Sequence, residues 1–241
     1  MTNIQQLKTI LQNAGSIVFF GGAGVSTESG IPDYRSADGL YNTKYAHPPE
    51  TMLSYSFFLR HTSEFYRFYR DKMLYPNAQP NKAHLALAEL EKRGKLKAVV
   101  TQNIDGLHQQ AGSVNVLELH GSAHRNYCMD CKKQYPLETI IRAEDVPRCS
   151  CGGLIRPDVV LYEEGLDGRV MEKAARAMRD AEVLIVGGTS LNVYPASGLI
   201  RYYGGGKLIL INKSETPYDA YADLLIRENI GETLGACVLE G

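Results

Sequence analysis

Short apolar runs alternate with longer amphipathic stretches along most of this chain. Residues 17–20, 96–101, 183–186 and 207–211 form runs rich in valine, isoleucine, leucine and phenylalanine. A fifth run, residues 114–119, ends directly before a histidine. Strands with near-continuous apolar sequence are typical of parallel sheets whose two faces are both covered. The pattern therefore predicts an α/β fold built on a parallel sheet.

The stretches between these runs carry apolar residues at helical spacing. Near the N-terminus, Ile4, Leu7, Ile10 and Leu11 form a single stripe. Repeats of strand, turn and helix favour a sheet with helices on both faces. We expect helices over residues 1–15, 56–73, 83–93, 169–180 and 195–203, and a short helix or turn at 49–53.

Composition and charge narrow the class of protein further. With 241 residues, 44% of them hydrophobic, the chain can form one large domain, or a large and a small one. Polar residues interrupt the N-terminal stripe, unlike a signal peptide, and no stretch approaches the ~20 apolar residues of a membrane span. The formal charge of −1 gives no reason to expect nucleic acid or an anionic membrane as partner. We expect a cytoplasmic protein, with a monomer favoured.

The first strand runs directly into a glycine-rich turn. Gly22 and Gly24 are followed by the polar residues 26–29 and then Gly30. A buried strand, a glycine-rich turn and a helix start form the plan of a dinucleotide site. Glycine leaves no side chain between the backbone and a pyrophosphate, and free N–H groups at the helix start face the anion. The five residues before Gly30 differ from the G-x-G-x-x-G of ordinary dehydrogenases, and a tight turn without a ligand is the alternative.

Polar residues also follow two further strands. Residues 102–105 come after the strand at 96–101, and His120 comes after the strand at 114–119. Open α/β sheets bind their ligands at the C-terminal ends of their strands, so we expect one shared cleft there. An imidazole in that cleft is suited to act as a general base, whereas a structural histidine and an Asn/Asp-Gly turn are the alternatives.

Four of the five cysteines are clustered in a stretch with little apolar periodicity. Cys128 and Cys131 are separated by two residues, and Cys149 and Cys151 by one. Four thiolates at such spacing can surround one Zn²⁺ tetrahedrally, and four protein ligands make such a site structural. Free or redox-active cysteines are the alternative, and Cys237 lies outside the cluster.

The stretch 22–36, GAGVSTESGIPDYRS, resembles the signature of the sirtuins, the NAD-dependent protein deacylases. Five more motifs follow in order: TQN-x-D at 101–105, the histidine and glycine at 120–121, the cysteine pairs, GTS-L at 188–191, and the isoleucine and asparagine at 211–212. Sirtuins usually have two residues between the second pair of cysteines, and phenylalanine at the position of Tyr34. The resemblance covers roughly residues 17–212.

The resemblance implies roles for individual residues. His120 would be the general base acting through the nicotinamide ribose, and Asn103 would hold a water. The substrate peptide would pair as a strand between Val159, Val160, Leu161 and Tyr162 on one side and Asn192 and Val193 on the other. NAD would contact Gly22, Ala23, Gly24, Thr27, Tyr34, Arg35, Gln102, Asn103, Ile104, Asp105, His120, Gly188, Thr189, Ser190, Asn212 and Ile230.

The implied fold is a Rossmann-type domain (residues 1–36, 81–124 and 155–241) with a helical insertion at 37–80 and a zinc-binding module at 125–154. The implied reaction transfers the acyl group of a modified lysine to ADP-ribose and releases nicotinamide. ADP-ribosyl transfer is the closest alternative activity. An NAD(P)-dependent oxidoreductase would recycle its cofactor, and a zinc module that binds nucleic acid would need a more basic surface around the cysteines.

The same resemblance also predicts which acyl group on lysine is preferred. Sirtuins that prefer succinyl- or malonyl-lysine carry a Tyr-x-x-Arg pair on the helix after the first cofactor loop. Here Tyr66 is followed three residues later by Tyr69, and Arg70 stands one position late. One residue turns a helical side chain by about 100°, so we expect Arg70 to point away from a tunnel that Tyr66 lines. Neutral acyl groups, acetyl first, should then be preferred.

Overall fold

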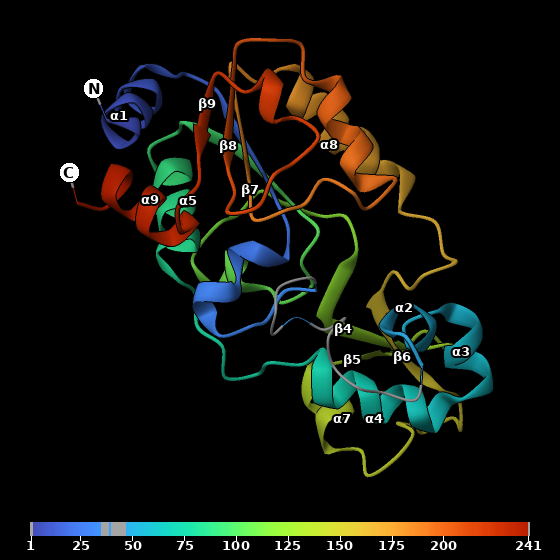
Figure 1. Ribbon diagram of the computed structural model, residues 1–241. Helices are drawn as coiled ribbons and strands as arrows, with labels where there is room; N and C mark the ends of the chain where they lie inside the picture. Colours follow the sequence, from blue (N-terminus) through green and yellow to red (C-terminus); the bar gives the residue numbers. More distant parts are fainter. Residues whose placement is uncertain (1, 35–38, 40–46, 241) are drawn as a thin grey trace.

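The computed structural model describes residues 2–34, 39 and 47–240. Its main sheet has the strand order β3-β2-β1-β7-β8-β9, and every neighbouring pair is parallel. This sheet confirms the predicted α/β fold (Figure 1). Its strands are β1 (Ile17–Gly21), β2 (Leu96–Thr101), β3 (Val116–Glu118), β7 (Val183–Gly187), β8 (Lys207–Ile211) and β9 (Leu224–Ile226).

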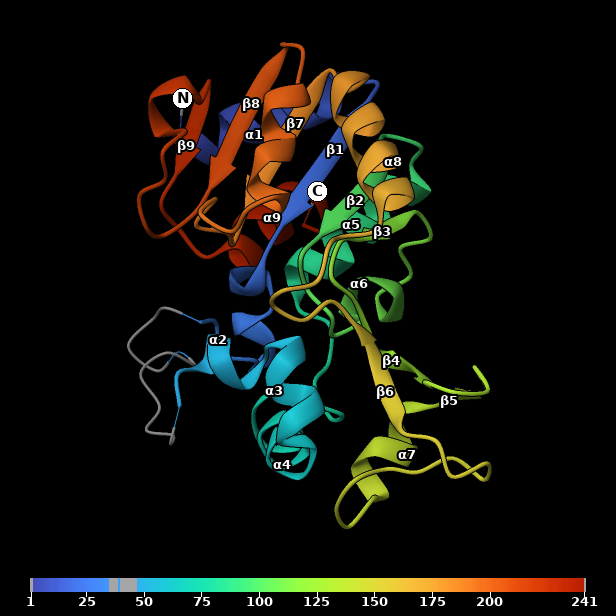
Figure 2. The same ribbon diagram turned by 90° about the vertical axis from the view of Figure 1, so that its right-hand side faces the viewer.

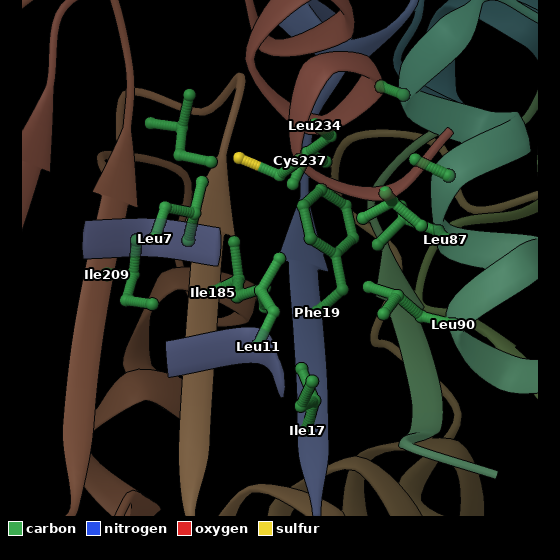
Figure 3. Packing of buried hydrophobic residues seen from close by; sticks show 14 of the residues in the cluster. Leu7, Leu11, Ile17, Phe19, Leu87, Leu90, Ile185, Ile209, Leu234 and Cys237 are labelled. Carbon is green, nitrogen blue, oxygen red and sulfur yellow. The ribbon is translucent and has the colours of Figure 1, made fainter. Parts of the chain in front are cut away.

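Alternation along β1 divides the core into two layers. Ile17 and Phe19 pack in one cluster, and Val18 and Phe20 pack in another, because successive side chains of a strand point to opposite faces. Leucines from three helices gather around Phe19 in the first layer (Figure 3). These helices are α1 (Asn3–Asn13), α5 (Lys82–Lys92) and α9 (Ile230–Val238), whereas α8 (Gly168–Arg179) and the 3-10 helix η4 (Ala196–Tyr202) cover the other face.

A smaller unit lies below the main sheet in Figure 2. This unit contains an antiparallel sheet with the strand order β5-β4-β6. Its strands are β4 (Gly121–Cys128), β5 (Gln134–Tyr135) and β6 (Ile155–Val159). Its core is aromatic and includes Phe58, Phe65 and Tyr69. The helices of this unit are α2 (Pro49–Met52), α3 (Tyr55–Arg60), α4 (Thr62–Lys72) and α7 (Leu137–Arg142).

Three helix predictions need correction. The predicted helix over 56–73 is two helices, α3 and α4, which meet at the non-helical His61 and bring the rings of Phe58 and Phe65 edge to face at 4.9 Å. The predicted helix over 195–203 is the 3-10 helix η4. The helix expected after the glycine-rich turn is two single 3-10 turns, η1 (Ala23–Val25) and η2 (Thr27–Ser29), and Gly30 ends the second with a φ of 81°.

The remaining short elements connect strands of the main sheet. They are α6 (Leu107–Gln110) after β2 and the 3-10 turn η5 (Asp219–Tyr221) before β9. The periodicity did not predict β4, β5, β6, β9, α6, α7 or α9. Among the described residues, no helix is both long enough and apolar enough to cross a membrane.

Candidate active site

One cleft of about 860 Å³ is lined by residues of both the main sheet and the smaller unit. Arg35 lies outside the described residues. Every other residue predicted to bind cofactor or substrate lines this cleft: Gly22, Ala23, Gly24, Thr27, Tyr34, Gln102, Asn103, Ile104, Asp105, His120, Val159, Val160, Leu161, Tyr162, Gly188, Thr189, Ser190, Asn192, Val193, Asn212 and Ile230.

Polar groups that follow three parallel strands meet at one edge of the sheet. Gln102 follows β2, Thr189 follows β7 and Asn212 follows β8. The Gln102 amide donates to the Thr189 hydroxyl at 3.0 Å, and the Thr189 N–H donates to the Asn212 side-chain oxygen at 3.0 Å. The C-terminal ends of parallel strands lie at the same edge, which is why residues so far apart in sequence share one cleft.

The glycine-rich turn is packed against the loop after β7. The Gly24 N–H donates to the Gly188 carbonyl at 2.8 Å, and a Cβ on Gly24 would lie 2.8 Å from the Gly188 Cα. The Val25 N–H donates to Gly22. The N–H groups of Gly24 and Val25 are therefore engaged within the protein and do not face an anion freely. Glycine is required here for close approach of two loops.

A serine links the first and second loops of the cleft. The Ser26 hydroxyl donates to Asp105 at 2.6 Å and accepts from the Asn103 amide at 3.1 Å. The other Asp105 carboxylate oxygen accepts from the Leu107 N–H at 2.9 Å. The sequence alone assigned no role to Ser26, although it is the first of the polar residues that follow Gly24. The three side chains are held as one unit on the cleft wall.

His120 is held in one orientation by the backbone of the second loop. Its Nδ1 lies 2.9 Å from the Gln102 carbonyl oxygen. A carbonyl only accepts, so Nδ1 carries the proton and Nε2 keeps its lone pair. Burial lowers the pKa of His120, although the bond to Gln102 opposes this shift. A neutral imidazole on the wall of the cleft can accept a proton at physiological pH.

The chain that follows β6 is tied to both sides of the cleft. The Val160 N–H donates to the His120 carbonyl at 3.0 Å, and the Tyr162 N–H donates to the Leu53 carbonyl at 3.0 Å. Arg156 and Glu164 form a bidentate ion pair with both contacts at 2.8 Å. This pair closes the segment from 156 to 164 into a fixed loop at the cleft.

The acyl-tunnel prediction is partly wrong. Tyr66 is absent from the cleft lining, because its hydroxyl donates into the core to the Ile155 carbonyl. Tyr69 lines the cleft in its place. Arg70 points away as expected, and its guanidinium donates to the Asp145 carbonyl at 2.8 Å.

A second missed contact joins the first loop to the C-terminal helix. The Glu28 carboxylate accepts from the Gly231 N–H at 2.7 Å, at the first turn of α9. Glu28 and Ile230 both line the cleft. An acidic side chain stabilises a helix N-terminus, and this contact fixes Ile230 at the edge of the cleft. Nothing local in the sequence pairs two residues so far apart.

The four clustered cysteines converge in the smaller unit, outside the cleft lining. Their sulfur atoms all lie within 4.8 Å of one another, and the pairs Cys128–Cys151 and Cys131–Cys149 are each 3.5 Å apart. A tetrahedron with Zn–S bonds near 2.3 Å places its sulfur atoms about 3.8 Å apart. The spacing of one residue between Cys149 and Cys151 therefore fits zinc, and the Tyr135 hydroxyl supports Cys149 with a hydrogen bond of 2.9 Å.

The fold and the cleft define an α/β protein with a ligand site at the strand ends and a structural metal site in a separate small unit. Residues 22–195 match the model of the Sir2 family. The chain is 60% identical to an NAD-dependent protein deacetylase of Clostridium acetobutylicum, with 97% of each chain covered. It is 48% identical to one of Sulfolobus acidocaldarius, covering 92% of this chain and 88% of the relative.

Solved structures agree with this match. A Sir2 protein in complex with a deacetylated p53 peptide and 3′-O-acetyl ADP-ribose superposes with a TM-score of 0.91 and 40% identity, covering 100% of this chain and 99% of that one. A Sir2 complex with a p53 peptide and NAD⁺ gives 0.84 and 40%, with 97% and 96% covered. The chain belongs to the Sir2 family, the sirtuins, and the resemblance in its motifs is confirmed.

Proposed function

We propose that His120 is the general base of an NAD-dependent deacylation of protein lysines. The chain is an NAD-dependent protein deacetylase of the Sir2 family. The observation that carries the proposal is the His120 ring itself. Its Nδ1 donates to the Gln102 carbonyl, which leaves Nε2 as the proton acceptor on a side chain that lines the cleft.

The residues at the strand ends fit the co-substrate NAD. Gln102, Thr189 and Asn212 offer amide and hydroxyl groups that can bind ribose hydroxyls, and Asp105 can accept from a carboxamide N–H. When bound, NAD supplies the ribose that takes over the acyl group while nicotinamide leaves. The Ser26 contacts hold Asp105 and Asn103 in fixed positions before any ligand arrives, which reduces the entropy lost on binding.

The peptide substrate would bind between two backbone segments of the cleft. Residues 159–162 and 192–193 line it, and the first segment is tied to His120 and Leu53 by backbone hydrogen bonds. A peptide added as a strand is bound through its main chain, so many sequences around the modified lysine are tolerated. A cytoplasmic location and a monomeric state remain predictions from the sequence.

The test is product analysis with one variant. The wild type, NAD and an acetylated peptide should release nicotinamide and form deacetylated peptide in equal amounts. His120→Ala should lower this rate by about 100-fold or more, the usual size of a general base, with unchanged unfolding temperature. An unchanged rate would remove His120 from the mechanism. ADP-ribose attached to protein would indicate the transferase alternative, and an absorbance change of reduced nicotinamide would indicate an oxidoreductase.

A further inference from the structure

Tyr69 carries a buried hydroxyl that no described residue satisfies. It lies on α4, its relative exposure is 0%, and it is one of the residues that line the cleft. The hydroxyl has no hydrogen-bond partner among the described residues. Buried hydroxyls normally find a partner, because leaving one unpaired costs free energy. A residue that lines the cleft therefore holds a hydroxyl whose hydrogen-bonding capacity the described residues leave unused.

The packing around Tyr69 holds its ring in one orientation. Its ring stacks on that of Phe65, one helical turn earlier, with centroids 5.5 Å apart and an interplanar angle of 13°. Burial raises the pKa of Tyr69, so the phenol stays protonated and remains a donor. A fixed, protonated hydroxyl can discriminate between ligands with and without a matching polar atom.

The neighbouring Tyr66 shows what a structural tyrosine looks like in the same helix. It is also fully buried, but its hydroxyl donates to the Ile155 carbonyl and it does not line the cleft. The two residues differ in whether the protein itself uses the hydroxyl and in whether they line the cleft. Tyr66 is therefore a matched control for Tyr69.

The surroundings of Tyr69 indicate which part of a substrate would reach it. Tyr69 belongs to an apolar cluster with Ile104 and Leu161, and all three line the cleft. Leu161 lies in the segment proposed to pair with the peptide. An apolar wall beside that segment suits an acyl chain. Lys72, at the end of α4, also lines the cleft, and its ammonium lies 3.2 Å from the exposed Asp71 carboxylate.

We infer that the Tyr69 hydroxyl is a specificity determinant that favours acyl groups carrying a hydroxyl oxygen beyond the amide carbonyl. This inference rests on the proposed function of the cleft. A hydroxyacyl chain would give Tyr69 its missing hydrogen bond, whereas an alkyl chain of equal length would leave it unpaired. The preference should be about three- to tenfold, the range expected of one neutral hydrogen bond.

The test compares matched acyl pairs on one peptide. We would measure kcat/KM for 3-hydroxybutyryl against butyryl lysine, and for lactyl against propionyl lysine, because the two pairs place the hydroxyl at different depths. At least one ratio should exceed about 3 in the wild type, fall to about 1 in Tyr69→Phe and keep its value in Tyr66→Phe. Each ratio is taken within one variant, so a general loss of stability or rate cancels.

Any of three results would overturn the inference. One is a wild-type ratio near 1 for both pairs, and another is a ratio that survives in Tyr69→Phe. A ratio lost equally in Tyr66→Phe would also overturn it, since the effect would then come from packing of α4. Acetyl-lysine measured in the same assay reports on deacetylation itself, so failure of the proposed function would appear as no turnover of any acyl group.

Discussion

The ion pair between Arg156 and Glu164 holds the loop that we propose receives the substrate peptide. The Arg156 side chain is 8% exposed and that of Glu164 is 24% exposed. Arg156 also donates to the Val159 carbonyl at 3.0 Å, and Glu164 accepts from the Leu161 N–H at 2.9 Å. Replacing Glu164 with glutamine keeps the size of the side chain and removes its charge.

The loss of stability in Glu164→Gln follows from the charge of Arg156, which remains buried without its partner. Removing one partner of a buried ion pair costs about 3–5 kcal/mol, because the remaining charge is left uncompensated. Glu164 is partly exposed and glutamine still offers one acceptor oxygen, so we expect a smaller loss, about 2–3 kcal/mol. For a chain of this size that corresponds to a fall in unfolding temperature of about 5–10 °C.

The assay joins stability to kinetics. Thermal unfolding at pH 7 should show the fall for Glu164→Gln, and KM for the peptide should rise more than KM for NAD, because the loosened segment is the one that lines the peptide side of the cleft. The matched control is Glu172→Gln, which removes an exposed Arg176–Glu172 pair on α8. Exposed pairs within one helix contribute about 0.3–0.5 kcal/mol, so the control should hardly change.

The pH dependence gives a second check with a defined sign. Burial alone raises the pKa of the Glu164 carboxyl, but its bonds to Arg156 and the Leu161 N–H lower it overall from 4.5. A lowered pKa contributes stability that is complete above the unfolded value and is lost as pH falls through the folded value. The difference between wild type and Glu164→Gln should therefore shrink below about pH 4. A stability difference between wild type and Glu164→Gln that does not change with pH would refute this account of the ion pair. So would a loss of stability in Glu172→Gln as large as that in Glu164→Gln.

Three further predictions follow from the site. Because the pKa of His120 is lowered from 6.5, deacetylation should be flat with pH above about 7 and fall only in acid; a fall that begins above pH 7 would contradict a neutral base. Metal analysis should find one zinc per chain, and Cys128→Ser should lose this zinc and unfold the smaller unit. If the purified protein contains no zinc, the assignment of the four cysteines as zinc ligands is wrong. The kcat/KM for acetyl-lysine should exceed that for succinyl-lysine, and a succinyl preference abolished by Lys72→Met would show that Lys72 reaches the acyl group.

The parts of the fold that could be predicted are those whose pattern is local. The strands β1, β2, β7 and β8 are continuous apolar runs because both their faces are buried, and that burial is visible in the sequence. In contrast, β9 has three residues, and β4 is mainly polar and pairs with β6 from a distant part of the chain. Neither carries a periodic signal of its own, so both were missed.

The sequence predicted which residues line the candidate site better than it predicted the contacts that these residues make. Polar residues after strand ends could be grouped because parallel strands end at the same edge of a sheet. Their partners could not, since Ser26 meets Asp105 and Glu28 meets Gly231 only after the chain has folded. The choice between Tyr66 and Tyr69 failed for the same reason, because the hydrogen bond from Tyr66 to Ile155 of β6 forms only in the folded chain.

The glycine-rich turn shows why a motif can identify a site while its usual explanation is incomplete. Gly188 has a φ of 59°, and a Cβ placed on it would lie 2.3 Å from the Val25 backbone nitrogen. A Cβ on Gly24 would in turn lie 2.9 Å from the Gly188 carbonyl oxygen. The two loops thus exclude side chains from each other, and this contact holds the loop after β1 against the loop after β7. Any substitution there would widen the cleft at the point where both loops supply its wall, so the demand for glycine comes from the protein's own packing as much as from the ligand.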